Sequence, residues 1–273
     1  MTIFSIPFIV VIGWAVGAGV NYLADVLPWK RALTRPFCLK CQAQFPQKNY
    51  WFWPRRCPAC GARRPWRTLA VEVFFSLAAI WLWQYPSPPL GFWLSLLLLA
   101  YFGVVVVIDI EYHLILHPVS LVGTVLGLAL GVWWRTQQFD PSMSSLAAWW
   151  FGLWTSLAGG ALGFGIMFFF YGLGGLFMRL MNRLRAETVE EDALGFGDVN
   201  LSGVLGLLLG WHLIPVGLFL SVLLAGGFSL LYLIIKLFTR RYHAFMALPY
   251  GPFLVAGAAW LVYFPQGLLN LLR

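Results

Sequence analysis

Charged side chains are scarce in this sequence. Lysine, arginine, aspartate and glutamate make up 10% of the 273 residues, whereas soluble domains carry about 25%. Hydrophobic residues make up 60%, and the mean hydropathy is +0.79. This composition excludes an ordinary soluble protein and predicts an all-α polytopic membrane protein.

Acidic residues are absent from the segment in which basic residues are concentrated. Ten of the 18 lysines and arginines lie between Lys30 and Arg67, with no aspartate or glutamate among them. The rest of the chain therefore carries a net charge of −2 (+8 minus +10). Because the positive charge belongs to one loop, we expect it to face anionic lipid headgroups, and nothing in it calls for a nucleic-acid partner.

Cysteine is limited to four residues in two C-x-x-C pairs, Cys38 with Cys41 and Cys57 with Cys60. Two such pairs at this spacing favour one tetrahedral zinc ion, and four ligands leave no open position for catalysis. The sequence thus predicts a structural zinc in a loop that needs metal to fold. A thiol–disulfide pair or unligated thiols are the alternatives, and a reducing compartment disfavours the disulfides.

Long apolar segments account for most of the remaining sequence. We count eight, at about 3–27, 69–84, 91–110, 118–134, 145–178, 199–210, 213–237 and 250–264, so we expect about eight transmembrane helices. The first lacks a basic region before it and is too long for a signal peptide, which favours a retained span. The segment 145–178 is too long for one straight span, and its glycines allow close packing or a bend. The expected domains are a first helix (1–28), a zinc-binding domain (29–68) and a membrane-embedded core (69–273).

Basic residues in the connections predict the orientation. They are concentrated in the first, fifth and seventh connections, with Arg135 alone in the fourth, so the positive-inside rule places odd connections in the cytoplasm and both termini outside. The third connection is then cytoplasmic as well. Asp109 at the end of the third span and Asp198 at the start of the sixth should both lie at the cytoplasmic membrane edge.

The two aspartates carry the chemistry that we expect. A carboxylate inside a membrane costs about 2.5–3.5 kcal/mol on insertion scales and usually serves a function. Two carboxylates that share a proton can activate water and polarise a peptide carbonyl. Gly195 and Gly197, just before Asp198, would let a substrate backbone approach closely. Alternatively, Asp198 caps its helix and Asp109 is a solvated interfacial residue.

Two further acids are interpreted as structural. Glu72 lies inside the second span, and we expect it to accept a hydrogen bond from Asn21 or from an arginine near the cytoplasmic edge. Asp25 lies near the cytoplasmic end of the first span, where Lys30 or Arg31 could pair with it, although an ordinary interfacial residue is the favoured interpretation.

The combination of these motifs resembles a known family. Gly195-Phe196-Gly197-Asp198 before a membrane helix, with Val107-Ile108-Asp109 at an earlier helix end, is similar to the membrane aspartic proteases. The two C-x-x-C pairs after the first span narrow the resemblance to the type IV prepilin peptidases. Three further motifs also resemble that family: Val16-Gly17-Ala18-Gly19-Val20-Asn21, Val71-Glu72 and Pro249-Tyr250-Gly251-Pro252-Phe253.

The resemblance implies an activity in the bacterial inner membrane. Such enzymes cleave the short basic leader from prepilins and pseudopilins after a glycine, and many then N-methylate the new terminus with S-adenosylmethionine. It also implies that Asp109 and Asp198 are the catalytic pair and that Cys38, Cys41, Cys57 and Cys60 bind the metal. The chain departs from the family in lacking the acid of a Leu-Pro-Asp motif, since Ile115-Leu116-His117-Pro118 stands there. It also has Asn200 where lysine is usual, and no glycine-rich nucleotide-binding signature is found.

Two other functions remain open from the residues alone. Intramembrane carboxylates also serve transporters and proton relays, although these often contain inverted repeats and no clear repeat is found here. A non-enzymatic scaffold could use the zinc loop to bind assembly proteins. The sequence predicts neither the oligomeric state nor the particular prepilin.

Overall fold

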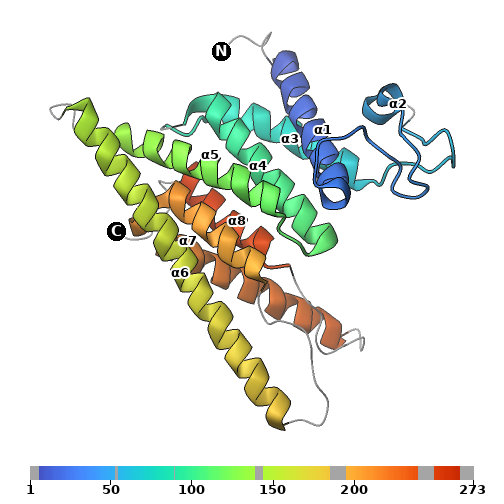
Figure 1. Cartoon of the computed structure of the whole chain (residues 1–273). Coiled ribbons are helices and arrows are strands. Elements are labelled where there is room, and N and C mark those ends of the chain that lie inside the picture. Colours follow the sequence, from blue (N-terminus) through green and yellow to red (C-terminus); the bar gives the residue numbers. More distant parts are fainter. Residues whose placement is uncertain are drawn as a thin grey trace. The chain divides into compact units, whose positions relative to one another are not determined.

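The described part of the chain is almost entirely helical (Figure 1). This computed structural model describes residues 6–52, 55–88, 90–138, 144–184, 195–238 and 249–264. Among them the only β-pairing is two isolated bridges. The chain divides into two units, Met1–Tyr112 and His113–Arg273. The expected all-α class is confirmed, whereas the three expected domains stay a prediction.

The first unit contains three long helices and the cysteine-rich loop. α1 (Ile6–Lys30) packs against α3 (Arg67–Gln84) and α4 (Gly91–Tyr112), and the loop between α1 and α3 holds the short α2 (Gln47–Trp51). Glycines allow α1 to approach α3, because a Cβ on Gly13 would lie 2.5 Å from the Phe75 carbonyl oxygen. A Cβ on Gly17 would lie 2.8 Å from Cα of Glu72. The small residues of α1 thus form a helix–helix interface, as is common in membranes.

The second unit contains α5 (His117–Thr136), α6 (Ser145–Leu184), α7 (Phe196–Phe238) and α8 (Gly251–Tyr263). α7 packs against each of the other three helices. Glycines again permit the contact, since Gly159 of α6 and Gly206 of α7 approach each other backbone to backbone. A Cβ on Gly127 of α5 would lie 2.8 Å from the Val204 carbonyl oxygen of α7.

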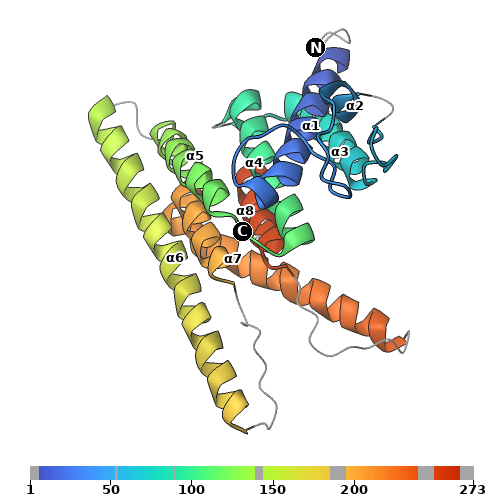
Figure 2. The same ribbon diagram turned by 45° about the vertical axis from the view of Figure 1, so that its right-hand side comes forward.

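α6 distinguishes between the two possibilities for its glycines, close packing and a bend. It is one helix of 40 residues (Figure 2), about 60 Å long at 1.5 Å per residue. Three of its glycines pack closely against α7: Gly159 faces Gly206, a Cβ on Gly160 would lie 2.6 Å from the Leu207 side chain, and a Cβ on Gly163 would overlap the Ser202 carbonyl oxygen. A Cβ on Gly165, Gly172 or Gly175 would meet nothing within 4 Å. The first three glycines therefore mark an interface and not a bend.

α7 contains a break that separates two expected spans. Gly210 has non-helical angles (φ 71°, ψ 173°) between the segments 199–210 and 213–237. Arg135 of α5 donates hydrogen bonds to the carbonyl oxygens of Leu208 at 3.0 Å and of Leu209. The arginine thus satisfies carbonyl groups that have lost their helical partners at the break.

Several helices can cross a membrane. Among the described residues, five helices are long and apolar enough, namely α1, α4, α5, α6 and α7, and α8 is a shorter apolar helix. With α7 broken at Gly210, these helices and α3 match the eight apolar segments. The connections 185–194 and 239–248, which contribute basic residues to the orientation prediction, lie outside the described residues.

Candidate active site and metal centre

Asp109 lies near the end of α4 and is buried, with 4% of its surface exposed. Val105 and Ile108, on the same helix, are also buried. A carboxylate buried in this way costs free energy, and such residues usually serve a function. The alternative of a solvated interfacial residue does not fit this burial.

The end of α4 lies beside the basic loop. The indole Nε1 of Trp29 at the end of α1 donates to the Tyr112 hydroxyl at 3.2 Å. Arg67 Nη1, at the start of α3, donates to Glu111 Oε2 at 2.8 Å. Asp109 therefore lies near the same end of the first unit as the cysteine-rich loop.

Asp198 lies in the first turn of α7 and is 8% exposed. Its backbone N–H donates to the Gly195 carbonyl oxygen at 3.0 Å, and its carbonyl oxygen accepts from Ser202 Oγ at 2.8 Å. The residue is inside the helix and not at the N-cap position. A carboxylate there still interacts favourably with the positive end of the helix dipole.

The two glycines before Asp198 differ in their surroundings. A Cβ on Gly197 would lie 2.9 Å from Cβ of Ile115, so no larger residue fits without movement. A Cβ on Gly195 would lie 3.5 Å from Asp198 Oδ2, an ordinary contact directly beside the carboxylate. Neither glycine has a positive φ. Close approach is therefore the reason for glycine at 197, and access to Asp198 is the reason we infer for Gly195.

Tyr250 is a neighbour of Asp198 that was not among the candidate catalytic residues predicted from the sequence. It precedes α8 and interacts electrostatically with the Asp198 carboxylate. The motif Pro249-Tyr250-Gly251-Pro252-Phe253 was the available signal. Asp109 belongs to the first unit and Asp198 to the second.

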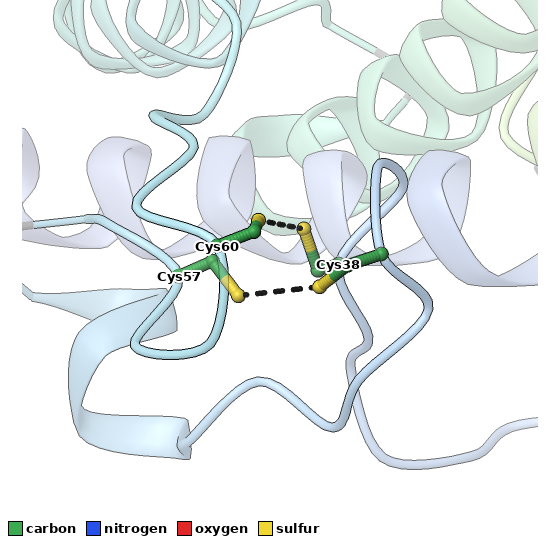
Figure 3. Close-up of side chains that lie close together, drawn as sticks. Cys38, Cys57 and Cys60 are labelled. Atoms are coloured by element: carbon green, nitrogen blue, oxygen red, sulfur yellow. Dashed lines mark hydrogen bonds between the residues drawn. The ribbon is translucent and has the colours of Figure 1, made fainter.

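The four cysteines come together as the spacing predicts (Figure 3). Their sulfur atoms all lie within 4.8 Å of one another. Cys38 Sγ lies 3.7 Å from Cys60 Sγ, and Cys41 Sγ lies 3.7 Å from Cys57 Sγ. Sulfurs 2.3 Å from a tetrahedral zinc ion are separated by about 3.8 Å, so the set fits the ion. All four cysteines are free, which disfavours the disulfide alternative.

The two halves of the cysteine cluster have the same local structure. The backbone N–H of Cys38 donates to the Ala43 carbonyl oxygen, and the Cys38 carbonyl oxygen accepts from the N–H of Gln42. Cys57 makes the same two bonds, with Ala62 and Gly61. Gln42 and Gly61, each directly after the second cysteine of a pair, both have positive φ (57° and 68°). The repeated turn explains why both pairs present their sulfurs to one point.

The thiols have unequal proton affinities. The backbone N–H groups of Cys60 and Ala59 lower the pKa of the Cys57 thiol to about 7. The backbone N–H of Ala43 also lowers the pKa of Cys41, but hydrogen bonds with the other thiols outweigh it and raise that pKa to about 12. Cys57 therefore becomes a thiolate, the form that binds metal, near neutral pH.

The cysteine-rich loop is fixed to the helices by ion pairs and aromatic contacts. Cys38, Cys57, Phe45 and Tyr50 form its buried core. Arg55 Nη2 lies 2.8 Å from Glu72 Oε2, so the expected arginine partner of Glu72 is found. The expectation for Asp25 is wrong: it pairs with Arg64 and Arg67, not with Lys30 or Arg31. Asn21 instead donates to the Thr68 carbonyl oxygen at 2.9 Å.

Sequence comparisons test the resemblance that these motifs indicate. Residues 96–230 match the Type IV leader peptidase family, and this segment contains both Asp109 and Asp198. The resemblance to prepilin peptidases is therefore confirmed by a family match over residues 96–230. Together with the apolar helices, the match makes the chain a multi-pass membrane protein.

Individual relatives agree with the family match. The chain is 27% identical over 212 residues to a prepilin leader peptidase/N-methyltransferase of Aeromonas hydrophila, covering 77% of this chain and 63% of that protein. It is 35% identical over 120 residues to leader peptidase HopD of Salmonella typhimurium, covering 42% and 64%. A prepilin leader peptidase/N-methyltransferase of Myxococcus xanthus is 26% identical over 229 residues, covering 79% and 59%. The chain thus spans less than two thirds of the length of these relatives. No solved structure matches.

Proposed function

We propose that this protein cleaves the basic leader peptide from type IV prepilins or pseudopilins at the cytoplasmic face of the bacterial inner membrane. The observation that carries the proposal is the position of the two aspartates. Asp109 and Asp198 are each buried near the end of an apolar helix, and both fall within the segment that matches a leader peptidase family.

Chain connectivity supports a joint role for the two aspartates. Ile115, which contacts Gly197, follows Asp109 by six residues, and six residues reach at most about 20 Å. The segment between Asp109 and Ile115 is therefore short enough to keep the carboxylates of Asp109 and Asp198 at one face of the membrane. This agrees with the orientation predicted from the basic loops, with both termini outside.

In the proposed reaction, Asp109 and Asp198 share one proton. The ionised carboxylate takes a proton from water as the water attacks the scissile carbonyl. The protonated carboxyl donates to the carbonyl oxygen, and a proton then passes to the leaving nitrogen. Burial raises the energy of two adjacent negative charges, which keeps one of the carboxyls protonated. Gly195 leaves room for an extended substrate backbone beside Asp198.

Zinc has a structural role in this proposal. Cys38, Cys41, Cys57 and Cys60 would hold the ion, and its bonds would supply folding energy to a loop with few large aliphatic residues. All four positions are protein ligands, so the ion would take no part in hydrolysis.

Binding of S-adenosylmethionine by this protein has weaker support than binding of zinc. The Aeromonas and Myxococcus relatives are named as N-methyltransferases, whereas the Salmonella relative is named as a leader peptidase. A pocket of ≈ 420 Å³ lies between α5, α6 and α7, with His117, Ser120, Thr124 and Asn200 as its polar lining. It has no acidic or basic partner for the charged groups of S-adenosylmethionine apart from that histidine. This pocket does not fit the cofactor, and we derive no methylation step.

The test of the proposal is cleavage by the purified protein in detergent. A prepilin-like peptide with a basic leader, a glycine and an apolar helix is incubated with the enzyme and analysed by mass spectrometry. We expect one cut directly after the glycine, and slower cleavage when the basic leader residues are replaced by glutamine. No cut by the folded, zinc-loaded protein with several prepilin sequences would contradict the proposal. Ion-coupled flux in vesicles would instead support a transporter.

A further inference from the structure

Asp25 of α1 accepts hydrogen bonds from both the cysteine-rich loop and α3. The Tyr50 hydroxyl donates to Oδ2 at 2.6 Å, and Arg64 Nη2 donates to the same oxygen at 2.9 Å. Arg67 Nη2 donates to the other oxygen, Oδ1. Asp25 is 5% exposed, so these bonds form in a region largely shielded from water. Burial and the neighbouring Asp25 charge raise the pKa of Tyr50, which keeps its hydroxyl protonated as a donor.

Arg67 continues this set of bonds to α4. One arm of its guanidinium, Nη2, contacts Asp25, and the other, Nη1, donates to Glu111 Oε2 at 2.8 Å. Glu111 follows Asp109 by two residues on the same helix. An unbroken series of hydrogen bonds therefore joins the metal-binding loop to the end of the helix that carries Asp109.

The two carboxylates compete for one guanidinium. An arginine binds a single carboxylate most strongly when both arms contact its two oxygens. Asp25 cannot offer both oxygens to Arg67, because Tyr50 and Arg64 occupy Oδ2. The second arm of Arg67 is thereby left for Glu111. This division depends on the loop being folded, since Tyr50 packs in the same buried core as Cys38 and Cys57.

We propose that the metal-binding loop positions the end of α4 through Asp25 and Arg67. With the loop folded, Arg67 bridges Asp25 and Glu111 and holds the last turn of α4. When the loop unfolds, Oδ2 of Asp25 becomes free, Arg67 pairs with Asp25 through both arms, and Glu111 is released. Asp25, Arg67 and Glu111 are thus positioning residues, and their consequence for catalysis rests on the proposed role of Asp109.

The chain offers a matched control for this route. Arg55 of the loop also pairs with a membrane helix, with its Nη2 2.8 Å from Glu72 Oε2 on α3. The Glu72 side chain is 4% exposed and that of Glu111 is 29% exposed, so replacing Glu72 is the harsher change for stability. The bonds that Glu72 makes to Arg55 and Trp14 do not involve α4. Glu72→Gln therefore removes an ion pair of the same 2.8 Å length as Arg67–Glu111. It leaves the hydrogen bonds that lead to the Asp109 end of α4 in place.

The test is amide hydrogen exchange of the full-length protein in detergent, with its zinc content measured before and after a chelator is added. In the wild type we expect zinc removal to speed exchange of residues 108–112 by about ten-fold, because the last turn of α4 opens more readily. In Glu111→Gln these amides should exchange fast with zinc bound and respond little to its removal. Glu72→Gln should respond as the wild type does. Unchanged exchange at 108–112 after zinc leaves the wild type would overturn the inference.

Cleavage kinetics distinguish a failure of this inference from a failure of the proposed function. Arg67→Lys keeps the charge but replaces the two-armed guanidinium with a single ammonium, which cannot hold both carboxylates in the same geometry. We expect a lower kcat with little change in KM, because substrate binding is untouched while Asp109 is misplaced. Absence of cleavage by the wild type, with the exchange pattern intact, would contradict only the proposed function. Normal cleavage together with no exchange response would contradict only this inference.

Discussion

Ile115 occupies the space in front of Gly197. A Cβ on Gly197 would lie 2.9 Å from Cβ of Ile115, at the start of the helix that carries Asp198. The glycine is therefore required by a specific neighbour in the same unit, and this gives its replacement a defined physical consequence.

Gly197→Ala should destabilise the second unit by about 1–3 kcal/mol, the usual range for overpacking. Thermal denaturation in detergent measures this. Gly195→Ala is the control, because its Cβ would make an ordinary 3.5 Å contact with Asp198 Oδ2. It should leave stability unchanged and slow cleavage. If Ile115→Ala restores the stability of Gly197→Ala, the clash is the cause; equal stability of both glycine variants would contradict this account.

Gln42 and Gly61 allow a test of the metal-binding turns. Both have positive φ at matching positions, but only Gln42 has a side chain that disfavours it. Gln42→Gly should stabilise the loop by about 0.5–1 kcal/mol, after allowance for the more flexible unfolded chain. Gly61→Ala should destabilise it by a similar amount, although nothing lies within 4 Å of its Cβ. Zinc retention during titration with a chelator reports both effects. Weaker retention by Gln42→Gly, or stronger retention by Gly61→Ala, than by the wild type would show that the backbone strain is not as described.

The break in α7 predicts a position-specific effect of alanine. At Gly210, φ is 71° and a Cβ would meet the Arg135 guanidinium, so Gly210→Ala should destabilise by about 1–2 kcal/mol or more. Gly203→Ala lies in regular helix, with its nearest contact at 3.4 Å, and should be close to neutral. Denaturation midpoints of the two variants are compared. Equal losses would mean that the break is not maintained in the protein.

The cysteine cluster predicts one zinc ion per chain. Metal analysis of protein purified without added metal should find it, and Cys57→Ser should reduce the content strongly, because structural sites need all four ligands. Loss of metal should also expose the loop to proteases, since the ion's binding energy contributes to its folding. Full zinc content in Cys57→Ser would exclude Cys57 as a ligand.

The apolar segments predicted the helices well because their lengths and turn residues are local properties of the sequence. The four cysteines were equally predictable, since their spacing fixes the ligand set. The partners of Asp25 were not, because Arg64 and Arg67 lie 39 and 42 residues away and only the folded loop brings them near. The role of the α6 glycines was left open by the sequence, since small residues permit both a bend and close packing. The partner helix α7 decides between the two.

The central claim is that Asp109 and Asp198 act as one pair, and a double-mutant comparison of cleavage rates tests it most directly. General acid–base groups contribute about 10²–10⁴-fold each, so Asp109→Asn and Asp198→Asn should each lower kcat at least that far. Because the two carboxyls share one proton, the double variant should be no slower than either single variant. Losses that multiply in the double variant, or full activity in either single variant, would contradict the pair.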